Sequence, residues 1–192
     1  MIAEPSFMRT YKLLGEHGKV LTELSKVLDL AYDPAVSMIT HCLAQGGKIL
    51  TCGNGGSAMQ AQHMAAEFVV RFETDRRALP CIGLSADPAI VTACGNDYGY
   101  TRIFSRQVEA YGNPQDCLIA FSTSGKSANV NEAVLVARNR GLVTLGISGN
   151  KGLSSGPDVD IIVPSSSTAR IQEMHLLIVH LLLEGVDSRV PA

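Results

Sequence analysis

Apolar runs alternate with amphipathic stretches along most of this 192-residue chain. From about residue 48 onward, each short apolar run is followed by a segment whose apolar positions recur at helical spacing. Unbroken apolar strands are typical of a sheet covered on both faces, and their alternation with helices is typical of parallel strands. The pattern predicts strands at residues 48–52, 79–84, 117–121, 142–147 and 159–163. It predicts helices at residues 57–72, 126–140 and 168–186, and two short helices between residues 88 and 111.

The N-terminal part of the chain has a helical pattern only. Residues 7–30 carry leucine, valine and tyrosine at mostly helical spacing. Asp33 and Pro34 then have the form of a helix start, with Asp33 as the N-cap and Pro34 at the first helical position. We therefore expect two N-terminal helices, the second of which ends at the glycine pair of residues 46–47.

Length and composition limit the class of protein. A chain of 192 residues suits one domain with an added arm. We place a helical arm at residues 1–36 and an α/β domain at residues 37–192. The net charge is −2 and charged residues make up 18% of the chain, which leaves no broad basic surface of the kind that nucleic acids require. We therefore expect no nucleic-acid partner.

Cysteine usage and the apolar runs favour a cytoplasmic protein. The five cysteines are odd in number and include no C-x-x-C pair, which favours reduced, buried thiols. Glu4 and Pro5 precede any apolar stretch, unlike the start of a secretion signal. The longest apolar run near the C-terminus is interrupted by His180 and Glu184, so it is too short and too polar to span a bilayer. We expect no membrane partner.

Two short polar loops carry the strongest functional signal. They have the sequences Cys-Gly-Asn-Gly-Gly-Ser at residues 52–57 and Ser-Thr-Ser-Gly-Lys-Ser at residues 122–127, each between an apolar run and a helical stretch. A helix start offers unpaired backbone N–H groups and the positive end of the helix dipole. Glycines let the backbone approach an anion, and hydroxyl groups add donors. Because ligands of open parallel sheets bind beyond the carboxyl ends of the strands, the two loops predict a clamp for one sugar phosphate.

Two other phosphate motifs fit these loops less well. Gly53-x-Gly55-x-x-Ala58 has the form of a dinucleotide fingerprint, but no acidic residue stands about 20 positions on at a strand end. A nicotinamide cofactor is therefore disfavoured. The second loop resembles a nucleotide-binding P-loop, but Ala120 occupies the position of its first glycine.

Candidate acid–base groups lie in two predicted helices, the one that follows the first loop and the last one in the chain. His63 and Glu67 are four residues apart and share a helix face. Gln172, His175 and His180 interrupt an otherwise apolar last helix, which favours burial of this helix. A single histidine in a helix is more often structural than catalytic. The coincidence of these groups with two phosphate loops favours acid–base chemistry on a bound sugar.

Several spaced motifs resemble a known family. The segments CGNGGSA, GNDYGY, FSRQV, STSGKSANV and RIQE occur in the order found in the phosphoheptose isomerases, also called sedoheptulose 7-phosphate isomerases, of the sugar isomerase (SIS) domain superfamily. The resemblance covers roughly residues 37–186. It implies a three-layer αβα sandwich with a five-stranded parallel, flavodoxin-like sheet, preceded by N-terminal helices. It also implies a homotetramer with active sites between subunits, and the conversion of sedoheptulose 7-phosphate to D-glycero-D-manno-heptose 7-phosphate.

The resemblance also implies roles for individual residues. Glu67 would act as the base and His180 as the acid in transfer through an enediol. Members of the family can carry zinc, here on His63, Glu67, Gln172 and His180, although a glutamine oxygen is a weak ligand. Arg71 matches an arginine that reaches a neighbouring subunit's site. The substrate-binding set, which also includes Arg71, would be Asn54, Gly55, Gly56, Ser57, His63, Glu67, Asn96, Asp97, Ser122, Thr123, Ser124, Ser127 and Gln172.

Two non-catalytic functions remain as alternatives. One branch of SIS proteins binds the bacterial replication initiator, and this chain has similar sequence segments at residues 71–74 and 169–175. That branch lacks the acid–base pair, whereas Glu67 and His180 are both present here, which favours an enzyme. A pure sugar-phosphate sensor would need the loops without the pair. Ala169 departs from the aspartate that some isomerases carry, so a sugar or interface contact there is expected to differ.

Overall fold

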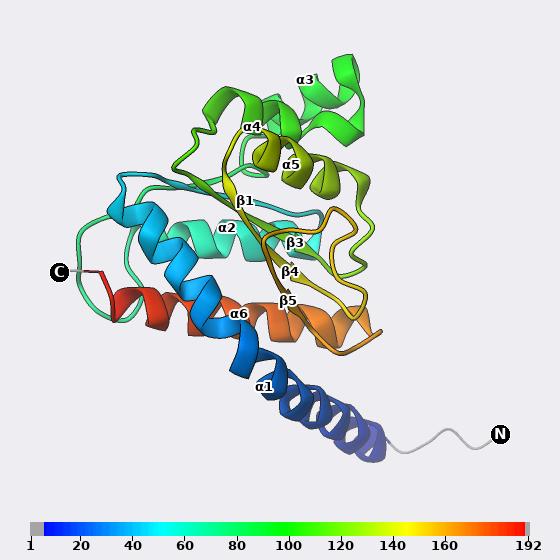
Figure 1. Ribbon diagram of the computed structural model, residues 1–192. Coiled ribbons are helices and arrows are strands. Elements are labelled where there is room, and N and C mark those ends of the chain that lie inside the picture. The colour runs from blue at the N-terminus through cyan, green and yellow to red at the C-terminus, as the bar shows by residue number, and fades with distance from the viewer. Residues whose placement is uncertain (1–5, 191–192) are drawn as a thin grey trace.

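A five-stranded parallel sheet forms the middle layer of the computed structural model, which describes residues 6–190 (Figure 1). The strand order is β2-β1-β3-β4-β5, which is the flavodoxin-like order. The sequence prediction of a five-stranded parallel sheet is therefore confirmed. The strands are β1 (Ile49–Cys52), β2 (Cys81–Gly83), β3 (Cys117–Ser122), β4 (Val143–Ser148) and β5 (Val159–Ile162).

Helices cover both faces of the sheet, so the fold is the expected three-layer αβα sandwich (Figure 1). Alternate strand residues point to opposite faces: Ile119 and Phe121 belong to the core under α1, α2 and α6, whereas Leu118 and Ala120 belong to the core under α4 and α5. The helices are α1 (Ser6–Ala44), α2 (Gly56–Val69), α3 (Pro88–Tyr98), η1 (Tyr100–Arg102), α4 (Ser105–Tyr111), α5 (Ala128–Asn139) and α6 (Thr168–Asp187).

The N-terminal segment differs from the expectation of two helices. It forms the single helix α1, with Pro34 in its interior. Leu24, on the N-terminal side of Pro34, and Ala35 and Ile39, on its C-terminal side, lie in the same buried core cluster. Because the apolar positions of α1 from Leu24 to Leu43 pack into this core on both sides of Pro34, packing outweighs the hydrogen bond that proline removes. The expected arm boundary at residue 36 lies within this helix, and Glu4 and Pro5 lie outside the described residues.

The two polar loops leave neighbouring strands at the same edge of the sheet. In the parallel β1–β3 pair, Thr51 is aligned with Ile119 and Cys52 with Ala120. The chain runs from β1 to the edge strand β2 on one side and from β3 to β4 on the other, so strand order reverses at this pair. Such a reversal opens a crevice beyond the carboxyl ends of the strands. The fold therefore places both loops where ligands of open α/β sheets bind.

The cysteines and helices are consistent with the compositional expectations. All five cysteines are buried free thiols, and burial raises the pKa of Cys52 to about 12. The expectation of reduced, buried thiols is confirmed. Within residues 6–190, no helix combines the length and apolar character needed to cross a bilayer.

One histidine lies fully inside the core. His175 on α6 is 0% exposed, and its ring contacts the ring of Phe121 edge-on at 6.0 Å between centroids. Neither ring nitrogen has a hydrogen-bond partner among the described residues. Burial lowers the pKa of His175 to about 4, and the backbone of Ser148 opposes this shift only in part. His175 is therefore a neutral core residue.

Replacing Pro34 by alanine should stabilise the protein. Pro34 is exposed in the middle of α1, and alanine would restore a backbone N–H that can donate to the carbonyl of Leu30. We expect a gain of about 1–2 kcal/mol in the free energy of unfolding, measured with urea. Pro88 is the control, because it occupies the first turn of α3, where no such donor is needed, and Pro88→Ala should not stabilise. A loss of stability in Pro34→Ala would contradict a continuous helix.

His175 should make stability depend on pH. The unfolded state binds a proton near pH 6.5 and the folded state only near pH 4, so folding stability is complete above pH 6.5 and falls as the pH drops toward 4. We expect the free energy of unfolding to fall by about 2 kcal/mol between pH 7.5 and pH 5.0 because of this residue. Urea unfolding of His175→Leu should show a flatter pH dependence by that amount. His41→Leu, on the exposed face of α1, should keep the wild-type dependence.

Candidate functional site

The first loop ends at the start of α2 with unpaired backbone donors. Gly55 has φ +53°, a left-handed conformation that favours glycine. In residues 6–190, the backbone N–H groups of Asn54, Gly55 and Gly56 make no hydrogen bond. A Cβ atom at Gly56 would lie 2.1 Å from the Nε2 atom of Gln172, so the Gln172 side chain packs directly on Gly56 and would have to shift for any larger residue. The loop therefore presents free N–H groups at a helix start, as an anion site requires.

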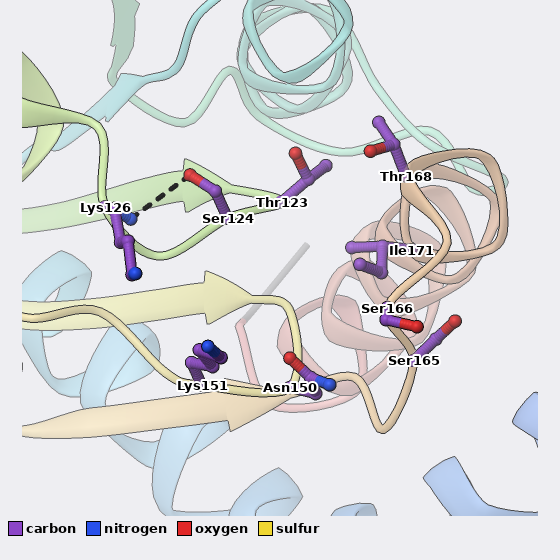
Figure 2. Close-up of a pocket in the computed structure, with 9 residues that line it drawn as sticks. All are labelled: Thr123, Ser124, Lys126, Asn150, Lys151, Ser165, Ser166, Thr168 and Ile171. Atoms are coloured by element: carbon purple, nitrogen blue, oxygen red, sulfur yellow. Dashed lines mark hydrogen bonds between the residues drawn. The ribbon is translucent and has the colours of Figure 1, made fainter.

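The second loop is held by its own hydroxyl groups. The Oγ atoms of Ser122 and Ser127 lie 3.2 Å apart, and the Gly125 N–H donates to Ser122 Oγ at 3.2 Å. The Lys126 N–H donates to Ser124 Oγ at 3.2 Å (Figure 2). Gly125 has φ +68° and sits so close to the carbonyl of Gly152 that no side chain fits there. The loop is thus a compact serine-rich turn before α5.

Side-chain amides join the two loops. Asn54 of the first loop and Asn129 of α5 exchange hydrogen bonds of 2.8 and 2.9 Å. The Tyr100 hydroxyl also donates to Asn54 Oδ1 at 3.0 Å. Two segments that are 75 residues apart in sequence are therefore fixed to each other.

A cavity of about 300 Å³ lies beside the second loop, beyond the carboxyl ends of β3, β4 and β5 (Figure 2). Two lysines line it and no acidic residue does, so the cavity carries positive charge and suits an anionic ligand. The lining residues are Thr123, Ser124, Lys126, Asn150, Lys151, Ser165, Ser166, Thr168 and Ile171.

Most of this cavity lining was missed from the sequence. Asn150 and Lys151 follow β4, and residues 165–168 follow β5, so the rule that ligands bind beyond strand ends could have indicated them. Only Thr123 and Ser124 were predicted. The glycine-rich and serine-rich composition of the two recognised loops made those loops stand out, whereas the later loops look like ordinary turns.

The candidate acid–base groups meet between α2 and α6. His63 Nε2 lies 3.1 Å from His180 Nε2 and 3.8 Å from Glu67 Oε1. The Phe72 ring contacts the His180 ring at 5.4 Å. The side chains of His63 and Glu67 are 38% and 25% exposed, so the cluster opens to solvent in the single chain. The fold thus brings together three predicted site residues from distant parts of the sequence: His63, Glu67 and His180.

Arg76 holds the two helices that carry this cluster. Its side chain is 4% exposed and forms a 2.7 Å ion pair with Asp187 at the end of α6. Its other nitrogens donate to the carbonyls of Glu67 at 2.9 Å and Phe68 at 3.0 Å. These carbonyls lie in the last turn of α2, where backbone acceptors lack helical partners. Arg76 therefore caps α2 and fixes it to α6, a role that no sequence pattern indicated.

The remaining predicted residues lie apart from the acid–base cluster or face solvent. The Gln172 side chain lies against Gly56. Gly56 is seven residues before His63, so Gln172 is about 10 Å from His63 along α2. Asn96 and Asp97 are exposed in α3 and hydrogen-bond to each other at 2.8 Å. Exposed Arg71 donates to two carbonyls of its own loop, at 3.2 and 3.3 Å. Among residues 6–190, no group of three His, Cys, Asp or Glu side chains is arranged to hold a metal ion.

Comparisons with known proteins agree with this architecture. The SIS domain family model matches residues 14–149. A phosphoheptose isomerase from Campylobacter jejuni subsp. jejuni is 49% identical over 175 residues, which cover 90% of this chain and 94% of that protein. The solved structure of a phosphoheptose isomerase from Neisseria gonorrhoeae has a TM-score of 0.87 at 39% identity, covering 94% of this chain and 98% of that one.

A second solved structure, a phosphoheptose isomerase from Francisella tularensis, has a TM-score of 0.88 at 34% identity and covers 97% of this chain and all of that one. The similarity therefore extends over nearly the whole length of each protein. On this sequence and structural similarity, the chain belongs to the phosphoheptose isomerase family of SIS domain proteins.

Proposed function

We propose that this chain converts sedoheptulose 7-phosphate to D-glycero-D-manno-heptose 7-phosphate through an enediol, the first step of bacterial heptose biosynthesis. One observation carries the proposal: the free N–H groups at the start of α2 and the His63–His180 pair lie along the same two helices, α2 and α6. The phosphate would bind at the helix starts, and carbons 1 and 2 of the sugar would reach the cluster. Relatives named phosphoheptose isomerase support the same activity.

The spacing along the helices suits a seven-carbon substrate. Contacts between α2 and α6 advance together, from Gln60 with Gln172 to His63 with His180, so the helices run parallel. His63 is seven residues beyond Gly56, a rise of about 10 Å. An extended heptose phosphate spans a comparable length. The substrate can therefore keep its phosphate at the first loop while its carbonyl end lies beside His63 and His180.

Phosphate binding is assigned to the two loops. The free N–H groups of Asn54, Gly55 and Gly56 point to this role, as do the hydroxyls of Ser57, Ser122, Thr123, Ser124 and Ser127. Lys126 and Lys151 of the adjoining cavity add positive charge that attracts a dianion. Holding the phosphate orients the reacting carbons, which is how binding of a remote group speeds proton transfer. The sugar contacts expected from Asn96, Asp97, Arg71 and Gln172 remain proposals.

Proton transfer is assigned to the cluster. Glu67 would take a proton from one of the two reacting carbons, and His180 would move a proton between the two oxygens. His63 lies within hydrogen-bonding distance of His180 and close to Glu67, so it can hold the His180 ring in one orientation. The presence of both Glu67 and His180 favours an enzyme over an initiator-binding or sensing protein of the same fold.

We also propose a cytoplasmic homotetramer with sites completed by neighbouring subunits. The N-terminal half of α1 carries exposed apolar side chains: Phe7 is 62% exposed, Tyr11 74% and Leu14 63%. A row of such residues on a helix is typical of a subunit contact. The solvent-open cluster and exposed Arg71 are consistent with a site that a neighbouring subunit closes.

A zinc ion is proposed at the same cluster. Two nitrogen ligands of a tetrahedral zinc lie about 3.4 Å apart, and the facing nitrogens of His63 and His180 are separated by 3.1 Å. With the nearby carboxylate of Glu67, these donors have the chemistry of a catalytic zinc site. Gln172, the fourth ligand that the family resemblance implies, lies against Gly56, about 10 Å along α2 from His63, so it does not reach the cluster in this structure. A bound zinc would supply Lewis acidity toward the sugar carbonyl.

The isomerase proposal predicts loss of turnover on changing either acid–base residue. Purified protein should convert sedoheptulose 7-phosphate to an aldose phosphate. Glu67→Gln and His180→Ala should each lower kcat by about 10²–10⁴-fold, because a general acid or base typically accelerates a reaction by that factor. Light scattering should show an unchanged assembly. Glu23→Gln, which only affects an exposed ion pair with Lys26, is the control. Unchanged turnover in both variants would refute the assignment, and inactivity toward a panel of ketose phosphates would favour a non-catalytic role.

The zinc proposal has a separate test. Elemental analysis of protein purified without chelator should find about one zinc per chain. His63→Ala and His180→Ala should each reduce the zinc content, and a chelator should lower the melting temperature of the wild type but not of the variants. His41→Ala, which removes an exposed histidine of α1, should keep the metal. Metal-free protein with full activity would remove zinc from the mechanism.

A further inference from the structure

The paired side-chain amides of Asn54 and Asn129 join the two polar loops. Asn129 is 3% exposed and lies at the second position of α5, two residues after Ser127. Asn54 lies three residues before Ser57. The pair therefore bridges the two helix starts directly beside the serines proposed to contact the phosphate.

The hydrogen-bond capacity of Asn54 is almost fully used inside the protein. Its Oδ1 atom accepts from Asn129 Nδ2 at 2.9 Å and from the Tyr100 hydroxyl at 3.0 Å, which occupies both lone pairs. Its Nδ2 group donates to Asn129 Oδ1 at 2.8 Å. That oxygen also accepts from the Val130 N–H at 3.0 Å, so it too is saturated. The Asn54 side chain is consequently committed to the protein, although the family resemblance places Asn54 in the substrate-binding set.

We propose that Asn54, Asn129 and Tyr100 act as positioning residues that set the gap between the two loops, and that the Asn54 side chain acts on the phosphate only through this gap. This inference rests on the proposed function, since it concerns the phosphate site of the same reaction. The free N–H groups of the first loop and the serine hydroxyls of the second must reach one anion together. A gap held by paired amides keeps both sets of donors at the distance that one phosphate group requires.

Tyr100 extends the connection to a third segment. It lies in η1, just after α3, and its ring is largely exposed while its hydroxyl reaches Asn54. The GNDYGY motif thus contacts the first loop through its last tyrosine. Because the ring is exposed, removing the hydroxyl alone should leave the fold intact.

Phosphate binding measured by calorimetry tests the inference without requiring turnover. The probe is inorganic phosphate, titrated into the purified full-length chain. Asn54→Ala and Asn129→Ala should each weaken phosphate binding about tenfold, the effect of losing one well-placed hydrogen-bonded contact. The double variant should also weaken it about tenfold, because the two amides act as one unit. Asn139→Ala, at the exposed far end of α5, is the matched control and should bind like the wild type.

Steady-state kinetics separates positioning from a general loss of structure. With sedoheptulose 7-phosphate, KM should rise by the same factor as the phosphate dissociation constant, while kcat stays within about twofold, because the phosphate is the group affected. Tyr100→Phe should raise KM and the phosphate dissociation constant about threefold each. It serves as the mild variant if Asn129→Ala does not fold. A lowered kcat with unchanged KM would contradict the assignment.

Three calorimetric results would overturn the inference. If Asn54→Ala weakens phosphate binding while Asn129→Ala does not, the Asn54 side chain contacts the ligand itself. If the double variant loses about a hundredfold, the two residues act independently. If neither single variant changes binding, the pair does not set the gap. Absence of isomerase activity with the expected calorimetric pattern would count against the proposed function and leave this inference standing.

Discussion

Parallel pairing between β1 and β3 brings the ends of two neighbouring strands to one edge of the sheet, and the helix after each strand begins there. Everything proposed for anion binding depends on this pairing, because neither loop alone surrounds a phosphate. The register fixes the loops laterally, and the amides of Asn54 and Asn129 fix them across the gap. Backbone pairing thus provides the coarse placement, and two side chains provide the fine one.

A second constraint is the parallel course of α2 and α6. Both helices begin at the ligand-binding edge of the sheet and run back along the same face, so the distance along them separates the anion site from the acid–base cluster. Arg76 ties the far ends together through Asp187 and the last carbonyls of α2. Because a buried, hydrogen-bonded ion pair resists sliding of one helix past the other, Glu67 and His180 keep their relative positions without touching directly.

Local sequence pattern predicted what depends on neighbours in the chain. The five strands were recognisable because they are continuously apolar, and the loops because glycines and serines follow two of them. The prediction of a helix start at Pro34 was wrong for a physical reason. Proline does favour the first turn of a helix, but buried apolar residues on both sides of Pro34 pack into one core and keep α1 continuous. Arg76 and Asn129 were not predictable, because their partners lie 111 and 75 residues away and only the folded chain brings them together. The proximity of His63 to His180 required the family resemblance for the same reason.

The exposure of the cluster bears on how the chemistry would proceed. A carboxylate that must take a proton from carbon is a weak base in water, and its usefulness rises when the site is closed around the substrate. In the single chain, His63 and Glu67 are open to solvent, and the only ring contacting His180 besides His63 is Phe72 within residues 6–190. In the proposed homotetramer, that closure would come from a neighbouring subunit. The exposed apolar row of α1 is the kind of surface that brings other subunits near, so assembly and catalysis would be coupled: the interface that stabilises the oligomer would also exclude water from the reacting carbons.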